Sequence, residues 1–241
     1  MPPHLWPGHP GTIALTSGFQ FSPLTASRKI LLAGLIASVI GIAADLLPRG
    51  SRAIVAGLAL TAGLASIWVF ASVLAQRQGS ALYVDAAGIA VFVTVLSALV
   101  LAIRHNGLRA GAAGLGLGLA TGVAAILSAS IGFLLAGVSL AAASGALLLV
   151  QVVFSRDIAA RFTGALPIAV LVSLFAAGSL MLAELPWYAL PLLILVPLAT
   201  MLPAAQQLSR IVRAALLAFY ALVAAAFPIA AAWHGARGSF G

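Results

Sequence analysis

Acidic side chains are the first candidates for chemistry in this chain, which has four of them. They are Asp45, Asp85, Asp157 and Glu184, and each stands alone near the end of an apolar stretch or between two such stretches. Acid–base catalysis uses positioned carboxylates, and a proton-coupled carrier needs one in its pathway. Asp45 precedes Arg49 by one helical turn, so we expect an ion pair near a membrane surface, with a proton or cation site as the alternative. For Asp85 and Glu184 we expect interfacial carboxylates, and all three remain candidate functional residues.

Histidine, cysteine and lysine restrict the other chemistries. The chain has no cysteine, and its four histidines, His4, His9, His105 and His234, all lie outside the apolar stretches. This pattern excludes thiolate metal sites and a membrane-embedded haem held by histidines. The single lysine, Lys29, precedes the first stretch, and no serine has a histidine within plausible reach. We therefore expect no catalytic residue, no metal site and no cofactor, and we favour a protein that is not an enzyme.

The elements that must position these residues follow from the composition. Apolar residues make up 63% of the 241 residues, charged residues make up 7%, and the mean hydropathy is +1.19. So few charges cannot cover a surface in water, which indicates a multi-pass membrane protein. The net charge of +8 comes from bases scattered between apolar stretches, a pattern that argues against nucleic-acid binding. The expected partners are the lipid bilayer and, within it, other membrane subunits or a second copy of the chain.

Eight apolar stretches come near the length of about 20 residues that a helix needs to cross the hydrocarbon core. We expect an all-α polytopic transmembrane helix bundle of about eight spans. The predicted spans are residues 30–47, 53–75, 81–103, 110–127, 131–154, 164–183, 187–202 and 211–232. Residues 1–29 are a Pro- and Gly-rich tail without the order of a secretory signal, residues 30–232 form the transmembrane domain, and residues 233–241 form a short C-terminal tail.

Basic residues are shared unequally between alternate loops. One set of loops holds Arg49, Arg52, Arg104, Arg109, Arg156, Arg161, Arg210 and Arg213. The other set, with the two chain ends, holds Arg28, Lys29, Arg77 and Arg237. This excess predicts that the first set is cytoplasmic and contacts anionic lipids, and that both termini lie outside. The preference for Arg over Lys, with abundant Ala, Gly and Leu, indicates a GC-rich bacterial genome and hence the bacterial inner membrane.

The cytoplasmic arginine pairs recur at a nearly constant interval, and most are followed by an apolar span. One interpretation is four tandem helical hairpins, an internal repetition found in many transporters. The alternative is that any hairpins of membrane-spanning length repeat near this period. Segments rich in Ala, Gly and Leu would then resemble one another by chance.

Small residues recur at every fourth position on two neighbouring spans. Gly114, Gly118 and Gly122 share one face of the fourth span, and Gly137 and Gly145 share one face of the fifth. Small residues let helix backbones approach closely in lipid. We expect the two faces to meet as a tight antiparallel pair, with an interface to another subunit as the alternative.

Three further polar or kinked positions lie inside the spans. Gln151 lies well inside the fifth span, where we expect an interhelical hydrogen bond. Pro191 and Pro197 must kink the short seventh stretch, which either spans the membrane or re-enters it. Broken helices can expose carbonyls at a substrate site, although ordinary kinks are common in membrane helices. A permease cavity would involve this stretch, with Thr200 and Glu184 at its rim.

Three functions fit these features. The one we favour is a non-catalytic accessory, assembly or structural subunit of a membrane complex, because the charges are interfacial and the loops are short. The second is a small permease or exporter with a cavity at the seventh span. The third and weakest is a membrane enzyme acting on a lipid-linked substrate, which would need paired acids or histidines at one face.

Overall fold

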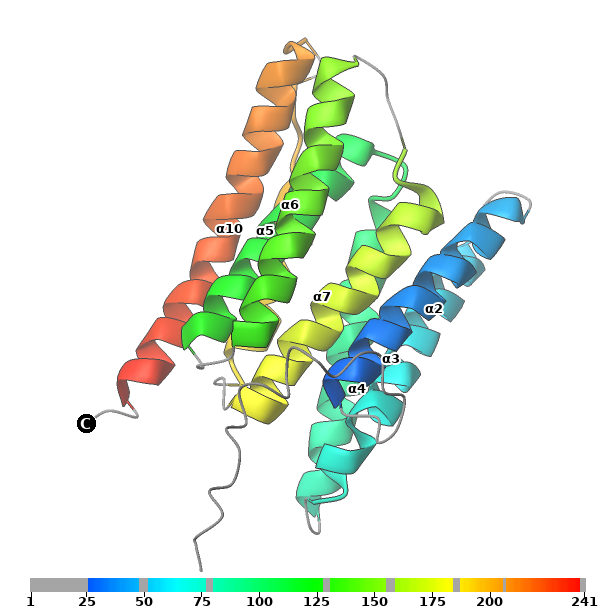
Figure 1. Ribbon diagram of the computed structural model, residues 1–241. Helices are drawn as coiled ribbons and strands as arrows, with labels where there is room; N and C mark the ends of the chain where they lie inside the picture. The colour runs from blue at the N-terminus through cyan, green and yellow to red at the C-terminus, as the bar shows by residue number, and fades with distance from the viewer. Residues whose placement is uncertain are drawn as a thin grey trace, which may run out of the picture.

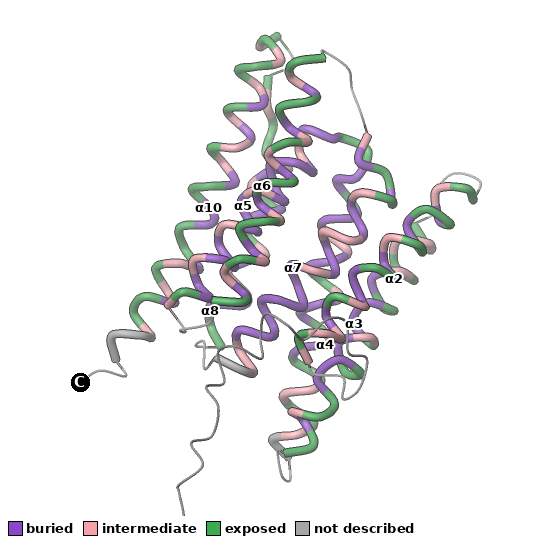
Figure 2. Tube along the Cα trace, in the orientation of Figure 1, coloured by how far each residue is buried: buried purple, intermediate pink, exposed green. Residues whose placement is uncertain are grey.

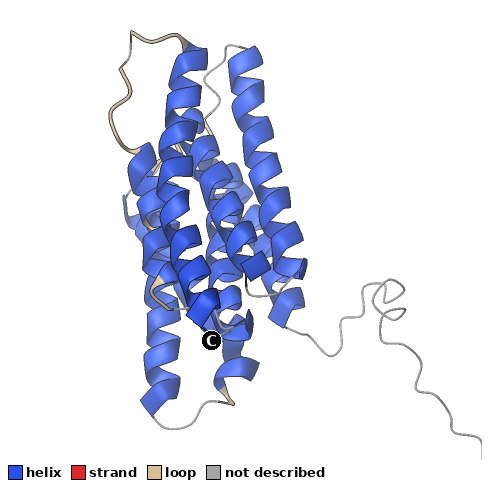
Figure 3. Cartoon of the chain, turned by 90° about the vertical axis from the view of Figure 1, so that its left-hand side faces the viewer, coloured by secondary structure: helices blue, strands red, loops and turns tan. Residues whose placement is uncertain are grey.

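The computed structural model describes residues 26–47, 52–76, 80–127, 131–154, 159–183, 187–205 and 207–238. In chain order the helices are α2 (Ala26–Leu46), α3 (Arg52–Leu74), α4 (Ser80–Ala102), α5 (Gly107–Leu127), α6 (Ile131–Val153), α7 (Arg161–Ala183), α8 (Ala189–Leu193), α9 (Leu195–Thr200) and α10 (Arg210–Gly238). These ranges contain no strand. The long helices run side by side in one bundle (Figure 1 and Figure 3).

Seven of these helices are long and apolar enough to cross a membrane, judged by length and composition. They are α2 to α7 and α10. The prediction of an all-α, multi-pass membrane bundle is therefore confirmed. Several helices begin at an arginine, such as Arg52 for α3, Arg161 for α7 and Arg210 for α10. A charge is costly in hydrocarbon, so these three arginines indicate where α3, α7 and α10 meet the membrane surface.

The predicted seventh span differs from the other spans. Its apolar helix covers only Ala189–Thr200 and is interrupted at Ile194. This length gives a rise of about 18 Å, well short of the hydrocarbon core of about 30 Å. Pro197 has no N–H group to donate to the carbonyl of Leu193, which explains the interruption.

This segment nevertheless crosses the bundle. Helix α7 ends at the lower end of Figure 1, whereas α10 begins at the upper end. The described part of the connection between them contains α8, α9 and irregular backbone at residues 201–205. The segment is therefore neither a regular membrane-spanning helix nor a re-entrant loop. Residues 201–205 are exposed or half-buried, and the carbonyls of Met201 and Leu202 accept hydrogen bonds from the Arg109 side chain.

Successive long helices from α2 to α7 run in alternate directions along the bundle (Figure 1). Helices α3, α5, α7 and α10 all begin at the upper end, which we call the arginine-rich end because four of their first-turn residues are Arg52, Arg109, Arg161 and Arg210. The first residue of α2 and the last turn of α10 lie at the opposite end.

Helices α5 and α7 are the most buried of the seven long helices and run through the middle of the bundle (Figure 2). Two sequential hairpins are present, because α3 packs extensively on α4 and α5 packs even more extensively on α6. The first helix behaves differently: α2 packs mainly on α7 and only slightly on its chain neighbour α3. The bundle is thus not a simple row of consecutive hairpins.

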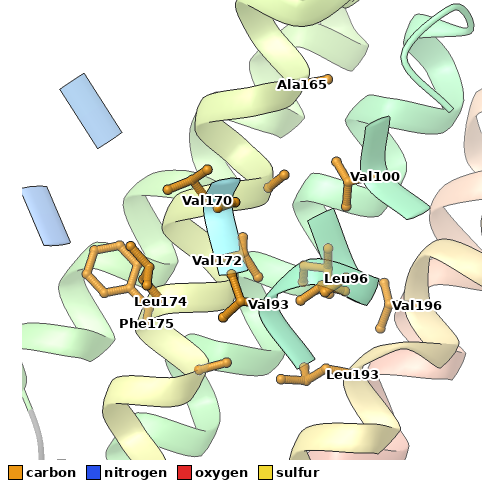
Figure 4. Packing of buried hydrophobic residues seen from close by; sticks show 14 of the residues in the cluster. Val93, Leu96, Val100, Ala165, Val170, Val172, Leu174, Phe175, Leu193 and Val196 are labelled. Carbon is orange, nitrogen blue, oxygen red and sulfur yellow. The ribbon is translucent and has the colours of Figure 1, made fainter. Parts of the chain in front are cut away.

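We call residues 187–200, an interrupted helical stretch that contains α8 and α9, the broken segment. The core between α4, α7 and the broken segment consists of aliphatic side chains (Figure 4). Val93 and Leu96 of α4, Val172 of α7, and Leu193 and Val196 of the broken segment are all fully or nearly fully buried. Lipid chains are as apolar as these side chains, so van der Waals packing rather than water expulsion holds the helices together.

Glycines allow α5 and α6 to approach at backbone contact. A Cβ atom added at Gly118 would lie 2.6 Å from the backbone nitrogen of Ala141, and one at Gly137 would lie 2.6 Å from the nitrogen of Gly122. At Gly122 the nearest atom to an added Cβ would be the Leu134 carbonyl oxygen at 3.4 Å. Backbone atoms cannot yield as a flexible side chain can, so Gly118 and Gly137 leave no room for a side chain.

The other two predicted packing glycines lie farther along the same helix pair. Gly114 faces Ser144, whose hydroxyl occupies the space that a Cβ would need. An added Cβ at Gly145 would lie 3.3 Å from the Cδ1 atom of Leu115. Gly145 therefore tolerates a small side chain far better than Gly118 does.

Candidate functional site

Asp45 caps a helix that lies far away in the sequence. Its Oδ1 atom accepts a hydrogen bond from the Phe162 backbone N–H (3.0 Å), and its Oδ2 atom accepts from both the Thr163 backbone N–H (2.9 Å) and the Thr163 hydroxyl (2.6 Å). The first N–H groups of a helix lack intrahelical acceptors, and a helix N-terminus favours a negative charge. The carboxylate at the end of α2 therefore fixes the start of α7.

The ion pair predicted between Asp45 and Arg49 lies outside the described residues, because Arg49 is not among them. The hydrogen bonds from Phe162 and Thr163 use both carboxylate oxygens. This arrangement accounts for a half-buried acid at the end of a membrane helix and supports a structural role over a proton or cation site.

Arg104 forms a second link to the start of α7. Its guanidinium lies 4.4 Å from the centroid of the Phe162 ring, and its Nη1 atom donates to the Leu101 carbonyl at 2.9 Å. The Arg104 carbonyl accepts the N–H of Arg161 at 3.2 Å. Arg161 has a φ of 50°, a left-handed conformation that costs a non-glycine residue about 1–2 kcal/mol. The contacts of Arg104 and Asp45 with this turn hold it in that conformation.

Arg104 is only 5% exposed, so its guanidinium does not lie at the surface. Burial lowers the pKa of Arg104, and the negative charge of Asp45 opposes that change. An arginine remains protonated in proteins, so this buried position keeps a positive charge over Phe162. Asp45, Arg104, Phe162 and Thr163 form one cluster, which we call the α7 cap.

Arg109 holds the end of the broken segment. Its Nη1 atom donates to the Met201 carbonyl at 3.0 Å, and its Nη2 atom donates to the Leu202 carbonyl at 3.4 Å. These carbonyls follow α9 and have no later helical turn to bind them. The carbonyls that the kinked segment exposes at this end are therefore bound by a neighbouring helix of the same chain.

The remaining arginines of the arginine-rich end are more peripheral. Arg210 donates to the Gln151 backbone carbonyl at 3.5 Å, and Arg213 donates to the Leu208 carbonyl at 3.4 Å. Arg52 and Arg161 are exposed. Arg156, like Arg49, lies outside the described residues.

Gln151 and Thr200 are both buried side chains away from any described cavity. The Nε2 atom of Gln151 has no hydrogen-bond partner within the described part of the chain, and the interhelical hydrogen bond expected of this side chain stays a prediction. The Thr200 hydroxyl donates to the Pro197 carbonyl at 2.8 Å. Thr200 thus satisfies one carbonyl of its own helix, and it is not among the residues that line the groove described next.

Asp85 lines a groove between α4, the end of α7 and α8. The groove has a volume of about 490 Å³. Its lining is Val84, Asp85, Gly88, Ile89, Val91, Phe92, Val95, Leu180, Met181, Trp187, Leu190, Pro191 and Ile194. Asp85 is the only charged residue among them, and it lies near the N-terminal end of α4. Glu184, the other predicted rim residue, lies outside the described residues.

Among the described residues, no group of three or more His, Cys, Asp or Glu side chains could hold a metal ion. The polar contacts among the described residues join helices at the α7 cap and at Arg109, and they lie apart from the apolar groove that Asp85 lines.

Sequence reasoning missed Phe162 and Thr163 as partners of Asp45. It began the sixth span at residue 164 and left both residues in the preceding loop. A threonine just before an apolar run is a helix-start signal that could have moved this boundary. Nothing local indicated that the cap would come from α2, because the partners are 117 and 118 residues apart.

No protein-family model matches the chain, and searches among curated proteins and among solved structures return no significant match.

Proposed function

We propose that this protein is a non-catalytic accessory, assembly or structural subunit of a membrane complex. The observation that carries this proposal is the use made of the ionisable groups at the arginine-rich end. Asp45, Arg104 and Arg109 each bind the end of another segment of the bundle. Groups used in this way hold a scaffold together, whereas a proton or ion pathway would need them to face a water-filled cavity.

The surface of the bundle gives a second argument for this role. Helix α6 is the least buried of the seven long helices, since it packs mainly on α5. Its outward face combines small residues such as Ser139 and Ala143 with large apolar ones such as Leu135. In lipid such a face suits either acyl chains or the helix of another subunit.

The test is purification from native membranes in a mild detergent, followed by measurement of the mass of the complex. We expect a stoichiometric partner to co-purify, and a monodisperse monomer would contradict the proposal. Ala143→Trp on α6 should remove a partner bound there, and Ala56→Trp, which is likewise exposed but lies on α3, is the matched control.

We further propose that the arginine-rich end is cytoplasmic, that both termini lie outside, and that the membrane is the bacterial inner membrane. The excess of arginine at one end of the bundle supports the orientation. Contacts between anionic lipid headgroups and the exposed arginines would follow from it, with Arg52 and Arg161 the most accessible described examples.

A small permease or exporter is the second candidate, and the α4–α7–α8 groove is the observation that favours it. The broken segment contributes Trp187, Leu190, Pro191 and Ile194 to that groove. The lining is apolar apart from Asp85, so a transported molecule would have to be lipophilic. Uptake or efflux of a lipophilic cation by reconstituted vesicles would support this candidate, and equal fluxes with and without protein would contradict it.

A further inference from the structure

The α4–α7–α8 groove has the dimensions of a ligand site. Its volume of about 490 Å³ lies within the range of roughly 300–1,000 Å³ that small-molecule sites occupy. On α4 the lining extends from Val84 to Val95, a rise of about 16 Å along the helix. A single extended hydrocarbon chain matches this shape better than a compact molecule does.

The groove is accessible from the bilayer. Its lining includes Val84, which is 69% exposed, Val91, which is 63% exposed, and the exposed Gly88, all on α4. Helix α4 is one of the seven helices able to cross a membrane, so these residues face lipid rather than water. A molecule dissolved in the membrane can therefore enter the groove sideways.

Charge selects the headgroup of that molecule. Asp85 is the single charged residue of the described lining, and none of the described lining residues is a basic one that would match a phosphate or sulfate. Trp187 is 74% exposed at the same rim, and the face of an indole ring attracts cations. A carboxylate has several acceptor positions, so Asp85 can bind a ligand in addition to the interaction that it makes within the chain.

We propose that the groove holds one membrane-resident amphiphile with an ammonium headgroup, whose head lies beside Asp85 and Trp187 and whose chain lies along Ile89, Phe92 and Ile194. This depth matches an amphiphile in a bilayer, because Asp85 lies near the end of α4 and the apolar lining continues towards the middle of the helix. The proposal goes beyond the subunit role and does not depend on it.

The test uses Trp187 as a local reporter. The full chain, with Trp6, Trp68 and Trp233 replaced by Phe, is reconstituted into phosphatidylcholine vesicles. Two probes with the same alkyl chain and a nitroxide near the head are compared, one an alkyltrimethylammonium and the other an alkyl sulfate. We expect saturable quenching of Trp187 by the ammonium probe at a several-fold lower membrane concentration. The net charge of +8 would produce the opposite preference without a specific site.

Two variants and one control locate the binding. Asp85→Asn should raise the concentration for half-quenching by the ammonium probe about two- to fivefold, the range of a partly exposed ion pair, and should not raise it for the sulfate probe. A Cβ at Gly88 or at Gly57 meets no atom within 4 Å, so both positions accept a larger side chain. Gly88→Phe fills the groove and should remove the saturable quenching, whereas Gly57→Phe on α3 should retain it.

Equal quenching by the two probes in the Trp187-only protein would overturn the proposal and would assign the groove to ordinary lipid chains. Retention of saturable quenching by Gly88→Phe would also overturn it. The probe comparison needs no variant at Asp85, so the test stands even if that substitution prevents folding. A partner that co-purifies without any ammonium binding would contradict this inference alone and leave the subunit role intact.

Discussion

Removal of the Asp45 carboxylate should destabilise the bundle by separating α2 from the start of α7. Asp45→Ala removes the acceptor of three hydrogen bonds, two of them from first-turn backbone N–H groups of α7. Loss of a helix cap costs about 0.5–2 kcal/mol, and hydrogen bonds to a charged group contribute more than neutral ones. We expect a loss of about 2 kcal/mol for Asp45→Ala. Asp45→Asn should lose about half of that stability. Its amide oxygen can still accept one of these hydrogen bonds, but its NH₂ group replaces the second acceptor oxygen and cannot accept from the remaining donors.

Thermal unfolding in detergent, followed by the loss of monodisperse protein, measures this effect. A chain of this size loses about 2–4 °C in Tm per kcal/mol, so Asp45→Ala should unfold about 4–8 °C earlier than the unmodified protein. Thr163→Val removes only the hydroxyl donor, and its effect combined with Asp45→Ala should be smaller than the sum of the two single effects. Ile42→Ala, on the exposed face of α2, serves as the control. A Tm for Asp45→Ala equal to that of this control would refute the capping argument.

Three other predictions test the helix contacts and the orientation. Gly118→Ile should cost about 1–3 kcal/mol and broaden the elution profile in detergent, because the new side chain meets the α6 backbone, whereas Gly57→Ile should behave like the unmodified protein. Arg109→Gln should cost about 1–2 kcal/mol in a chemical-denaturant titration, since it removes charged donors from the irregular backbone after α9. The chain has no cysteine, so a single introduced thiol reports which side of the membrane it lies on. We expect Gln207→Cys to react with a membrane-impermeant maleimide only in opened cells and Gln76→Cys to react in intact cells. The reverse pattern would contradict the proposed orientation.

The fold class could be read from the sequence because lipid imposes a simple rule: an apolar run of sufficient length must be a helix. Helices α3 and α10 begin at the arginines that interrupt such runs, and the predicted starts at residues 53 and 211 lie one residue from them, whereas α10 continues to Gly238, six residues beyond its predicted end. The structure of the seventh stretch was harder to predict. Its apolar length resembles a span, but Pro191 and Pro197 leave two short helices, and the length of helix that survives two prolines depends on the packing around them.

The polar contacts could not be predicted to the same extent. Asp45 and Arg104 were recognisable as charges near a membrane surface, yet their shared partner, the first turn of α7, is set by which helices lie side by side. That neighbourhood comes from long-range packing and not from periodicity, since α2 could equally have paired with the adjacent α3. The groove beside Asp85 was likewise invisible, because it is formed by residues from three helices and none of them is unusual alone.

The pairing of α2 with α7 has a consequence for biogenesis. Helix α2 is synthesised long before α7, the partner that lies against Ile30, Gly34 and Gly41 and that binds the Asp45 carboxylate. Until the ribosome has made Phe162, the nascent chain can assemble the α3–α4 and α5–α6 hairpins. Helix α2 then has only its slight contact with α3. Helix α2 must therefore stay without its main partner, in the membrane or beside the insertion machinery, until the five segments α3 to α7 have been synthesised. The late arrival of α7 would then join the two halves of the nascent chain, so that premature termination before that helix leaves an early segment exposed to quality-control proteases.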